Sequence, residues 1–178
     1  MSSPVSQALD ATASAVADDP SLAQAGFAAE GELVGLTEVD VRIGDRLVKV
    51  DQPETIGGTD LAPNPVQFAL ASLGACVAHT YRFWSEKLNI PLNGLQVNVQ
   101  GNLDIRGGLG LEEGVRAGFR DVAVAVRISG PEPAERYEQL RSAVDQHSAV
   151  LDIFGNQVPV RMSMSVGFRQ GMTPSIGT

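Results

Sequence analysis

The chain has a single cysteine, Cys76, and one of its two histidines, His79, follows three residues later. Residues three apart share nearly the same face of a helix, so His79 could serve as a base or proton relay for the thiol. The thiolate is the nucleophilic form of cysteine, and a thiol with an ordinary pKa of about 8.5 is mostly protonated at neutral pH. A nucleophilic Cys76 therefore needs a nearby cation or hydrogen-bond donors. Otherwise Cys76 is a small buried hydrophobe and His79 a hydrogen-bonded interface residue.

The second histidine, His147, allows two further kinds of chemistry that the spacing disfavours. Cys76, His79 and His147 could together supply three zinc ligands, but the sequence offers no fourth. Ser148 follows His147 directly, and adjacent residues on a helix point about 100° apart, which disfavours a serine nucleophile paired with this histidine. We predict no metal site and no cofactor, and we expect His147 to be an exposed residue near a helix end.

Charge and composition exclude several classes of partner. The formal net charge is −8 and the pI is about 4.7, which disfavours nucleic acid because phosphate neutralisation needs a basic face. The longest nearly apolar run, residues 66–78, is shorter than the roughly 20 residues that span a membrane. No lysine or arginine precedes Arg42, so the basic region of a secretory signal is missing. With one cysteine and hence no intramolecular disulfide, we expect a cytoplasmic protein without nucleic-acid or membrane partners.

One long helix dominates the predicted structure. Asn64 can cap it, Pro65 suits its first position and Pro91 cannot continue it, which predicts a helix over residues 66–88. The segment is apolar around most of its circumference until Tyr81. We therefore expect a central helix that is buried on all sides.

Apolar residues that alternate with polar ones predict the strands. Gly44-Asp45 separates two such runs and indicates a β-hairpin within residues 39–50. Further strands are expected at residues 95–104, 119–128 and 158–168, and an amphipathic helix at residues 132–147.

These elements determine the expected organisation of the chain. Residues 1–26 are small, acidic and only faintly amphipathic, so we expect a flexible or marginally helical N-terminal segment. Residues 27–178 then form one domain, a length that a single hydrophobic core can serve. Because strands and helices do not alternate strictly, the domain is expected to have an antiparallel-rich α+β fold.

Three stretches of the sequence together resemble the OsmC/Ohr superfamily, named after osmotically inducible protein C. They are GGTDLAPNPVQFALASLGAC, GFRDVAVAVRISG and DQHSAVLDIFGNQVPVRMSMSV, in this order along the chain. The resemblance implies an OsmC-like α+β fold in which antiparallel sheets wrap the central helices of an intertwined homodimer, with sites at the dimer interface. It also implies thiol-dependent reduction of organic hydroperoxides. In that chemistry Cys76 attacks the peroxide, a second cysteine resolves it as a disulfide, and an arginine and a glutamate hold the thiolate.

The sequence departs from the family pattern at the other catalytic positions. Ser148 stands where the family has its second, resolving cysteine, and a serine hydroxyl cannot form a disulfide with an oxidised Cys76. Val66 stands where the peroxidase branches have the glutamate. Arg42 and Arg46 both lie near the place of the activating arginine, and the sequence does not choose between them.

Two functions follow from the resemblance and its gaps. The first is a one-cysteine hydroperoxide reductase in oxidative-stress defence, with Cys76, His79 and either arginine as catalytic residues and an external thiol that reduces the sulfenic acid. The second is a catalytically inactive dimer of the same fold that binds a small apolar ligand or a partner, with Cys76 merely buried. Whether the chain is an enzyme depends on the reactivity of this thiol.

Overall fold

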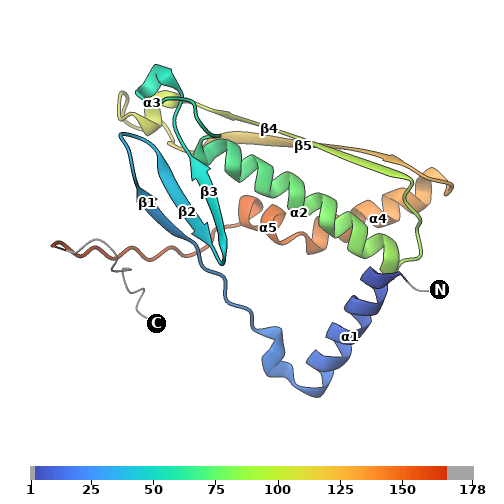
Figure 1. Ribbon diagram of the computed structural model, residues 1–178. Helices are drawn as coiled ribbons and strands as arrows, with labels where there is room; N and C mark the ends of the chain where they lie inside the picture. The colour runs from blue at the N-terminus through green and yellow to red at the C-terminus, as the bar shows by residue number, and fades with distance from the viewer. Residues whose placement is uncertain (1–2, 168–178) are drawn as a thin grey trace. The chain divides into compact units, whose positions relative to one another are not determined.

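The computed structural model describes residues 3–167 and confirms a mixed α+β fold with antiparallel sheets (Figure 1). The described residues form two compact units: unit 1 comprises residues 3–25 and 66–155, and unit 2 comprises residues 26–65 and 156–167. The elements, in chain order, are α1 (Pro4–Asp18), the 3-10 helix η1 (Pro20–Ala23), β1 (Glu30–Leu33), β2 (Val39–Ile43), β3 (Arg46–Val50), the 3-10 helix η2 (Glu54–Ile56), α2 (Pro65–Lys87), β4 (Gly94–Leu103), α3 (Ile105–Gly108), β5 (Phe119–Ser129), α4 (Ala134–His147) and α5 (Ala149–Gly155).

The N-terminal segment contains helix α1. Ser3 caps the helix, and its side chain accepts a hydrogen bond from Ser6 N at 3.1 Å. Pro4 occupies the first helical position, where its missing N–H costs nothing. None of the residues of α1 is buried, so its helicity rests on local capping rather than on packing.

Helix α2 begins and ends close to the predicted positions. Pro65 is its first residue. Asn89 adopts a left-handed conformation with φ of 50° just beyond the last turn, a common way for a helix to end. Leu73, Val77 and Tyr81 lie on one face and are 0%, 3% and 3% exposed. This face anchors the helix in the core of unit 1.

The burial of α2 is one-sided, which corrects the prediction that it would be buried on all sides. Its exposed residues include Ala71, Ser72, Ala75, His79 and Phe83. From Ser72 onward their spacing of three or four residues makes a stripe along the helix. The other elements of unit 1 cover only the opposite face, so an apolar composition does not by itself produce complete burial within one chain.

Strands β4 and β5 form a long antiparallel ribbon along α2, and α4 and α5 pack into the same core (Figure 1). Their bounds confirm two of the predicted strands to within one residue. Val97 pairs with Val126 and Val99 with Val124, and these side chains pack against the core. The core consists of Leu73, Val77, Tyr81, Ile90, Leu140 and Val144.

Helix α4 confirms the predicted amphipathic helix, although it begins two residues later, after Pro133 as its N-cap residue. It ends at His147, because Ser148 has an extended backbone with φ of −85° and ψ of 107°. Helix α5 starts at the next residue, Ala149. The predicted end of the helix at residue 147 is thus confirmed, whereas the sequence gives no sign of a new helix at Ala149.

In unit 2, strands β2 and β3 form the predicted hairpin. Ile43 pairs directly with Arg46, and Gly44 and Asp45 make the turn between them. Gly44 has φ of 58°, a conformation that favours glycine. Strand β1 adds antiparallel to the other edge of β2 and completes a three-stranded sheet.

The strand predicted at residues 158–168 does not form within the described part, residues 158–167. Phe168 lies outside the described residues. The alternating apolar side chains are exposed instead: Val160, Met162 and Met164 are 84%, 93% and 88% exposed. A strand needs a neighbouring backbone to satisfy its N–H and C=O groups, and among the described residues no strand pairs with this segment.

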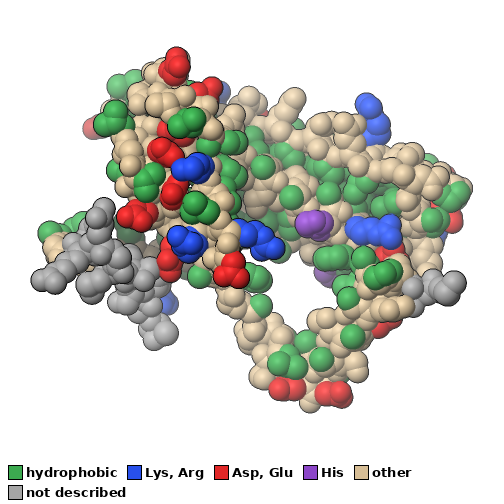
Figure 2. All heavy atoms as spheres, viewed as in Figure 1, with side chains coloured by type: hydrophobic (Ala, Val, Ile, Leu, Met, Phe, Trp, Pro, Cys, Tyr) green, Lys and Arg blue, Asp and Glu red, His purple; other side chains and the backbone are tan. Residues whose placement is uncertain are grey.

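The surface carries further apolar side chains, and Figure 2 shows hydrophobic groups, in green, among the charged ones on the face in view. Phe27 and Leu36 are 96% and 93% exposed.

Among the described residues, none of the helices combines the length and the apolar composition that crossing a bilayer requires.

Candidate functional site

The surroundings of Cys76 are built by three helices of unit 1. Cys76 lies in the middle of α2, and the junction between α4 and α5 passes beside its sulfur. Ser148 Oγ lies 3.5 Å from Cys76 Sγ, and Val150 N lies 3.4 Å from it. A hydroxyl and a backbone amide therefore both donate hydrogen bonds to the sulfur. Ser148 is 2% exposed, whereas the cysteine is half-buried.

The break between α4 and α5 positions these donors. Ser148 N donates to Val144 O at 3.0 Å and closes the last turn of α4. Val150 lies in the first turn of α5, where backbone N–H groups have no acceptor within their own helix. In an uninterrupted helix this amide would donate to residue 146. The break instead directs it at the thiol of Cys76.

Two opposing effects act on the pKa of the Cys76 thiol. Burial raises the pKa, because it disfavours the charged thiolate. Hydrogen bonds from the Ser148 hydroxyl and the Val150 amide lower it, followed by contributions from Thr80 and the Ala149 amide, and together they leave the pKa below its ordinary value. The requirement for groups that favour the thiolate is thus met by hydrogen-bond donors.

Sequence reasoning did not identify three of the groups that lower this pKa, Val150, Ala149 and Thr80. A backbone amide leaves no signal in residue types, so Val150 could not be found in this way. Thr80 follows Cys76 by four residues, a spacing that places both on one helix face and was a usable signal. In the structure Thr80 Oγ1 donates its proton to the Cys76 carbonyl oxygen at 2.8 Å.

The two histidines contact aromatic rings. His79 is exposed and stacks on Phe83 with ring centroids 6.4 Å apart. His147 stacks on Trp84 with centroids 4.4 Å apart. Within residues 3–167, no hydrogen bond joins either imidazole to Cys76, whose sulfur is bonded by the junction. In the same part of the chain, no group of three or more His, Cys, Asp and Glu side chains is placed to hold a metal ion.

The two candidate arginines belong to unit 2, whereas Cys76 belongs to unit 1. Arg42 lies on β2 opposite Leu47, and Arg46 lies on β3 opposite Ile43. Their role as an activating cation stays a prediction. Val66, at the position of the family's glutamate, is 37% exposed near the start of α2.

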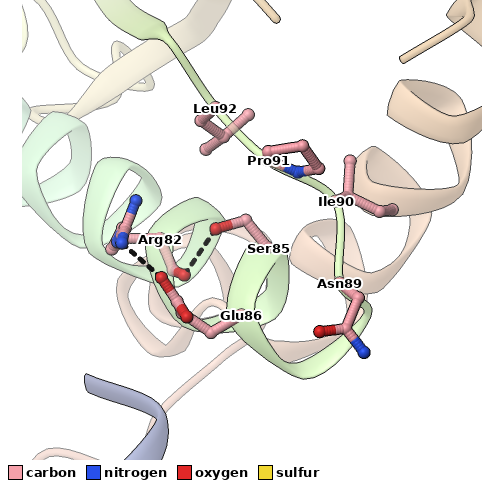
Figure 3. A pocket seen from close by; sticks show the side chains of 7 residues that line it. All are labelled: Arg82, Ser85, Glu86, Asn89, Ile90, Pro91 and Leu92. Atoms are coloured by element: carbon pink, nitrogen blue, oxygen red, sulfur yellow. Dashed lines mark hydrogen bonds and ion pairs between the residues drawn. The ribbon is translucent and has the colours of Figure 1, made fainter. Parts of the chain in front are cut away.

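A pocket of about 280 Å³ lies at the C-terminal end of α2 (Figure 3). Arg82 and Glu86 form an ion pair across one helical turn in its wall, as expected from their spacing. Arg82 is therefore engaged by a carboxylate of its own helix. The lining residues are Arg82, Ser85, Glu86, Asn89, Ile90, Pro91 and Leu92.

A groove of about 420 Å³ lies between the first half of α2 and strand β4. Its walls are mainly aliphatic, and it includes Ala75, the residue before the cysteine. The lining residues are Gln67, Leu70, Ala71, Gly74, Ala75, Val97 and Val99.

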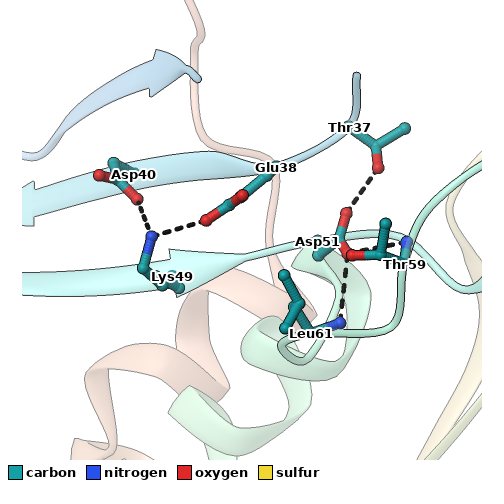
Figure 4. A network of polar contacts seen from close by, with 7 residues as sticks. All are labelled: Thr37, Glu38, Asp40, Lys49, Asp51, Thr59 and Leu61. Carbon is teal, nitrogen blue, oxygen red and sulfur yellow. Dashed lines mark hydrogen bonds and ion pairs between the residues drawn. The ribbon is translucent and has the colours of Figure 1, made fainter. Parts of the chain in front are cut away.

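A buried carboxylate, Asp51, organises unit 2 (Figure 4). It is 1% exposed and follows β3 directly. Its Oδ1 accepts from Thr37 Oγ1 at 2.5 Å. Its Oδ2 accepts from Thr59 N at 3.0 Å, Thr59 Oγ1 at 2.8 Å and Leu61 N at 3.2 Å. These hydrogen bonds, from Thr37 and then Thr59, hold the pKa of Asp51 well below its usual range against the opposing effect of burial.

The network around Asp51 fixes the loop that leads towards α2. Gly58 shows how tightly this loop packs, because a Cβ at this position would lie 1.7 Å from the carbonyl oxygen of Gln52. Only glycine fits there without moving the backbone. The GGT stretch of the sequence is thus explained by a close approach and by the hydrogen bonds of Thr59.

The OsmC family model, described as OsmC-like protein, matches residues 58–163. The match covers more than half of the chain and includes both the cysteine and the junction that contacts it. The chain belongs to the OsmC-like protein family. No curated protein matches it in sequence.

Solved structures share the fold at low sequence identity. An OsmC-like protein from Mycoplasma pneumoniae is 16% identical with a TM-score of 0.64, over 74% of this chain and 89% of that one. An organic hydroperoxide resistance protein OsmC from Legionella pneumophila is 22% identical with a TM-score of 0.55, over 72% and 88%. An organic hydroperoxide resistance protein from Elizabethkingia anophelis, with thiocyanate bound, is 18% identical with a TM-score of 0.57, over 72% and 87%.

Proposed function

We propose that this OsmC-like protein reduces organic hydroperoxides through Cys76, with an external thiol as the reductant. The observation that carries the proposal is the pair of hydrogen bonds from Ser148 and Val150 to the sulfur. Both bonds favour the thiolate, which is the form that attacks a peroxide. The names of the Legionella and Elizabethkingia proteins support the choice of substrate class.

The reaction has a balanced first half. The Cys76 thiolate attacks one peroxide oxygen, so that an S–O bond forms and the O–O bond breaks. The leaving alkoxide takes up a proton and departs as an alcohol, and Cys76 becomes a sulfenic acid. Ser148 donates a hydrogen bond to the sulfur but cannot trap the sulfenic acid as a disulfide.

The second half needs a thiol from outside the chain. One thiol attacks the sulfenic sulfur, releases water and forms a mixed disulfide with Cys76. A second thiol attacks that disulfide, restores the Cys76 thiol and leaves as the symmetrical disulfide. The reducing cytoplasm, which we propose as the location, contains such thiols.

We also propose that the protein acts as a homodimer. The segment of residues 158–166 keeps an apolar side chain at every second position without a strand to pair with among the described residues. Size-exclusion chromatography with light scattering is expected to give about twice the chain mass of 18.7 kDa. A Met162→Asp variant is expected to shift this mass towards the single chain.

The proposed activity is tested by following the consumption of cumene hydroperoxide with dithiothreitol as the reductant. The wild-type protein is expected to turn over, and Cys76→Ser is expected to fall to the uncatalysed rate. Separate Arg42→Ala, Arg46→Ala and His79→Ala variants test the predicted cation and base. If wild-type and Cys76→Ser proteins are equally inactive, the peroxidase proposal is wrong. An inactive dimer that binds a small apolar ligand then becomes the better account.

A further inference from the structure

Trp84 and Cys76 lie on the same helix and both meet the same short segment of chain. They are eight residues apart in α2, about 12 Å along the helix axis. Tryptophan side chains on a helix lean back towards its N-terminus, which brings the ring of Trp84 closer to the cysteine. The segment from His147 to Val150 contacts both side chains.

The segment from His147 to Val150 makes two neighbouring sets of contacts with α2. The imidazole of His147 stacks on Trp84 with 4.4 Å between ring centroids and 19° between the ring planes. The next residue, Ser148, and Val150 donate the hydrogen bonds to Cys76 Sγ. Lys87 Nζ also lies 4.5 Å from the centroid of the Trp84 ring.

We propose that Trp84 is a positioning residue for Cys76, because its stack on His147 holds the α4–α5 junction where Ser148 and Val150 reach the sulfur. The inference deepens the proposed function and rests on it, since a positioned thiolate matters for catalysis only if Cys76 reacts. Trp84 does not touch the sulfur itself. It acts through the backbone that follows His147.

The backbone at the junction is where such an attachment would act. Ser148 has an extended backbone, and the short helix α5 begins at the next residue. The hydrogen bonds to sulfur span 3.4–3.5 Å, and hydrogen bonds weaken steeply when their geometry is lost. A small displacement of the junction would therefore remove both donors together.

The same helix provides a matched control. Phe83 precedes Trp84 and stacks on His79 within α2, with 6.4 Å between ring centroids. That pair involves an aromatic ring and an imidazole, but it makes no connection to the junction. Phe83→Leu removes an aromatic side chain beside Trp84 and leaves the stack on His147 in place.

The test measures the pH dependence of Cys76 alkylation by iodoacetamide in the folded protein, without peroxide. At pH 7 we expect Trp84→Leu and His147→Leu each to slow alkylation about fivefold through a higher thiol pKa, since one pKa unit is tenfold in thiolate. Trp84→Phe is expected to keep most of the wild-type rate, and Phe83→Leu nearly all of it. The double variant Trp84→Leu/His147→Leu should be no slower than either single variant, because both remove one stack.

The outcomes separate this inference from the proposed function. Unchanged alkylation profiles in the single variants, or effects that add in the double variant, overturn the positioning role even if the protein consumes hydroperoxide. A profile that depends on Trp84 in a protein without peroxidase activity refutes the proposed function and keeps the positioning role. If Trp84→Leu does not fold, the exposed His147→Leu variant decides the question alone. Emission of the single tryptophan should change in His147→Leu, which reports the loss of the stack.

Discussion

Asp51 and Cys76 accept hydrogen bonds from similar donors, but the two groups differ in their exposure and in the role that we assign to them. Each acceptor receives a side-chain hydroxyl and a backbone amide: Thr59 supplies both to Asp51, and Ser148 and Val150 supply them to Cys76. Asp51 is 1% exposed and its two oxygens take four hydrogen bonds.

Cys76 differs in access and in the acceptor atom. It is only half-buried, and sulfur accepts from the junction at 3.4–3.5 Å rather than at the 2.5–3.2 Å found around Asp51. A buried carboxylate whose oxygens all accept hydrogen bonds stabilises the fold. A thiol whose charge is favoured while it stays reachable is available for chemistry.

Removal of the thiol should have the largest effect on activity. We expect Cys76→Ser to lower hydroperoxide consumption by at least about 100-fold, because no other nucleophile replaces it. The melting temperature should change by only about 2 °C, since few packing contacts are lost. Peroxidase assays and thermal melts check both statements, and a variant that keeps its activity would exclude Cys76 as the reactive group.

A second cysteine at the junction should convert the site to a two-cysteine site. Ser148 Oγ is 3.5 Å from the sulfur, so Ser148→Cys is expected to form a disulfide with Cys76 after one equivalent of hydroperoxide, with a loss of about 2 Da per chain. Ala149→Cys, one residue further on at an exposed position, is the control. Equal disulfide yields in both variants would contradict the geometry of the junction.

Substitution of Asp51 should lower the stability of the protein. Asp51→Asn replaces a charged acceptor of four donors, and we expect the melting temperature to fall by about 5 °C or more. Asp45→Asn, in the exposed hairpin turn of the same unit, should change it by about 1 °C or less. A mild effect of Asp51→Asn, comparable with that of Asp45→Asn, would show that the buried network is not the anchor of the loop.

The loss of stability at acid pH should also depend on Asp51. Its pKa is lower in the folded protein than the ordinary value of about 3.9, so its contribution is present above that value and is lost as pH falls towards the folded pKa. Urea unfolding between pH 2 and pH 5 is expected to show a steeper loss of stability below about pH 4 in the wild type than in Asp51→Asn. Parallel curves would assign the acid sensitivity to other groups.

The smallest effect is expected from a single donor to the thiol. Ser148→Ala removes one of the hydrogen bonds that favour the thiolate, so the pKa of Cys76 should rise and alkylation at pH 7 should slow about threefold. Ser148→Thr keeps a hydroxyl and should restore most of the rate. A faster reaction in the alanine variant would mean that access to the sulfur, rather than its charge, limits the rate.

Much of the fold could be predicted from local signals. Pro65 and Pro91 bracket α2, and Gly44-Asp45 marks the hairpin, because these residues restrict the backbone where they stand. Alternation predicted β4 and β5, which pair with each other within the chain. The same alternation was misleading at residues 158–167, because a pattern of side chains cannot supply the neighbouring backbone that a strand requires.

The candidate site was predictable only in part. Cys76 and Ser148 are separated by 72 residues, and no periodicity relates such distant positions, so the family resemblance had to connect them. The end of α4 at His147 matches the predicted bound, but the start of α5 at Ala149 has no signal in the sequence. This second helix start directs the Val150 amide at the thiol, so the donor set of the thiol could not be foreseen.

The most direct test of the account is the intact mass of the wild-type protein after one equivalent of cumene hydroperoxide, with dimedone present to trap sulfenic acid. We expect rapid formation of one dimedone adduct, located at Cys76 by peptide mapping and absent from Cys76→Ser. Oxidation of Cys76 no faster than that of free cysteine would contradict the claim that the junction prepares this thiol for reaction with peroxide.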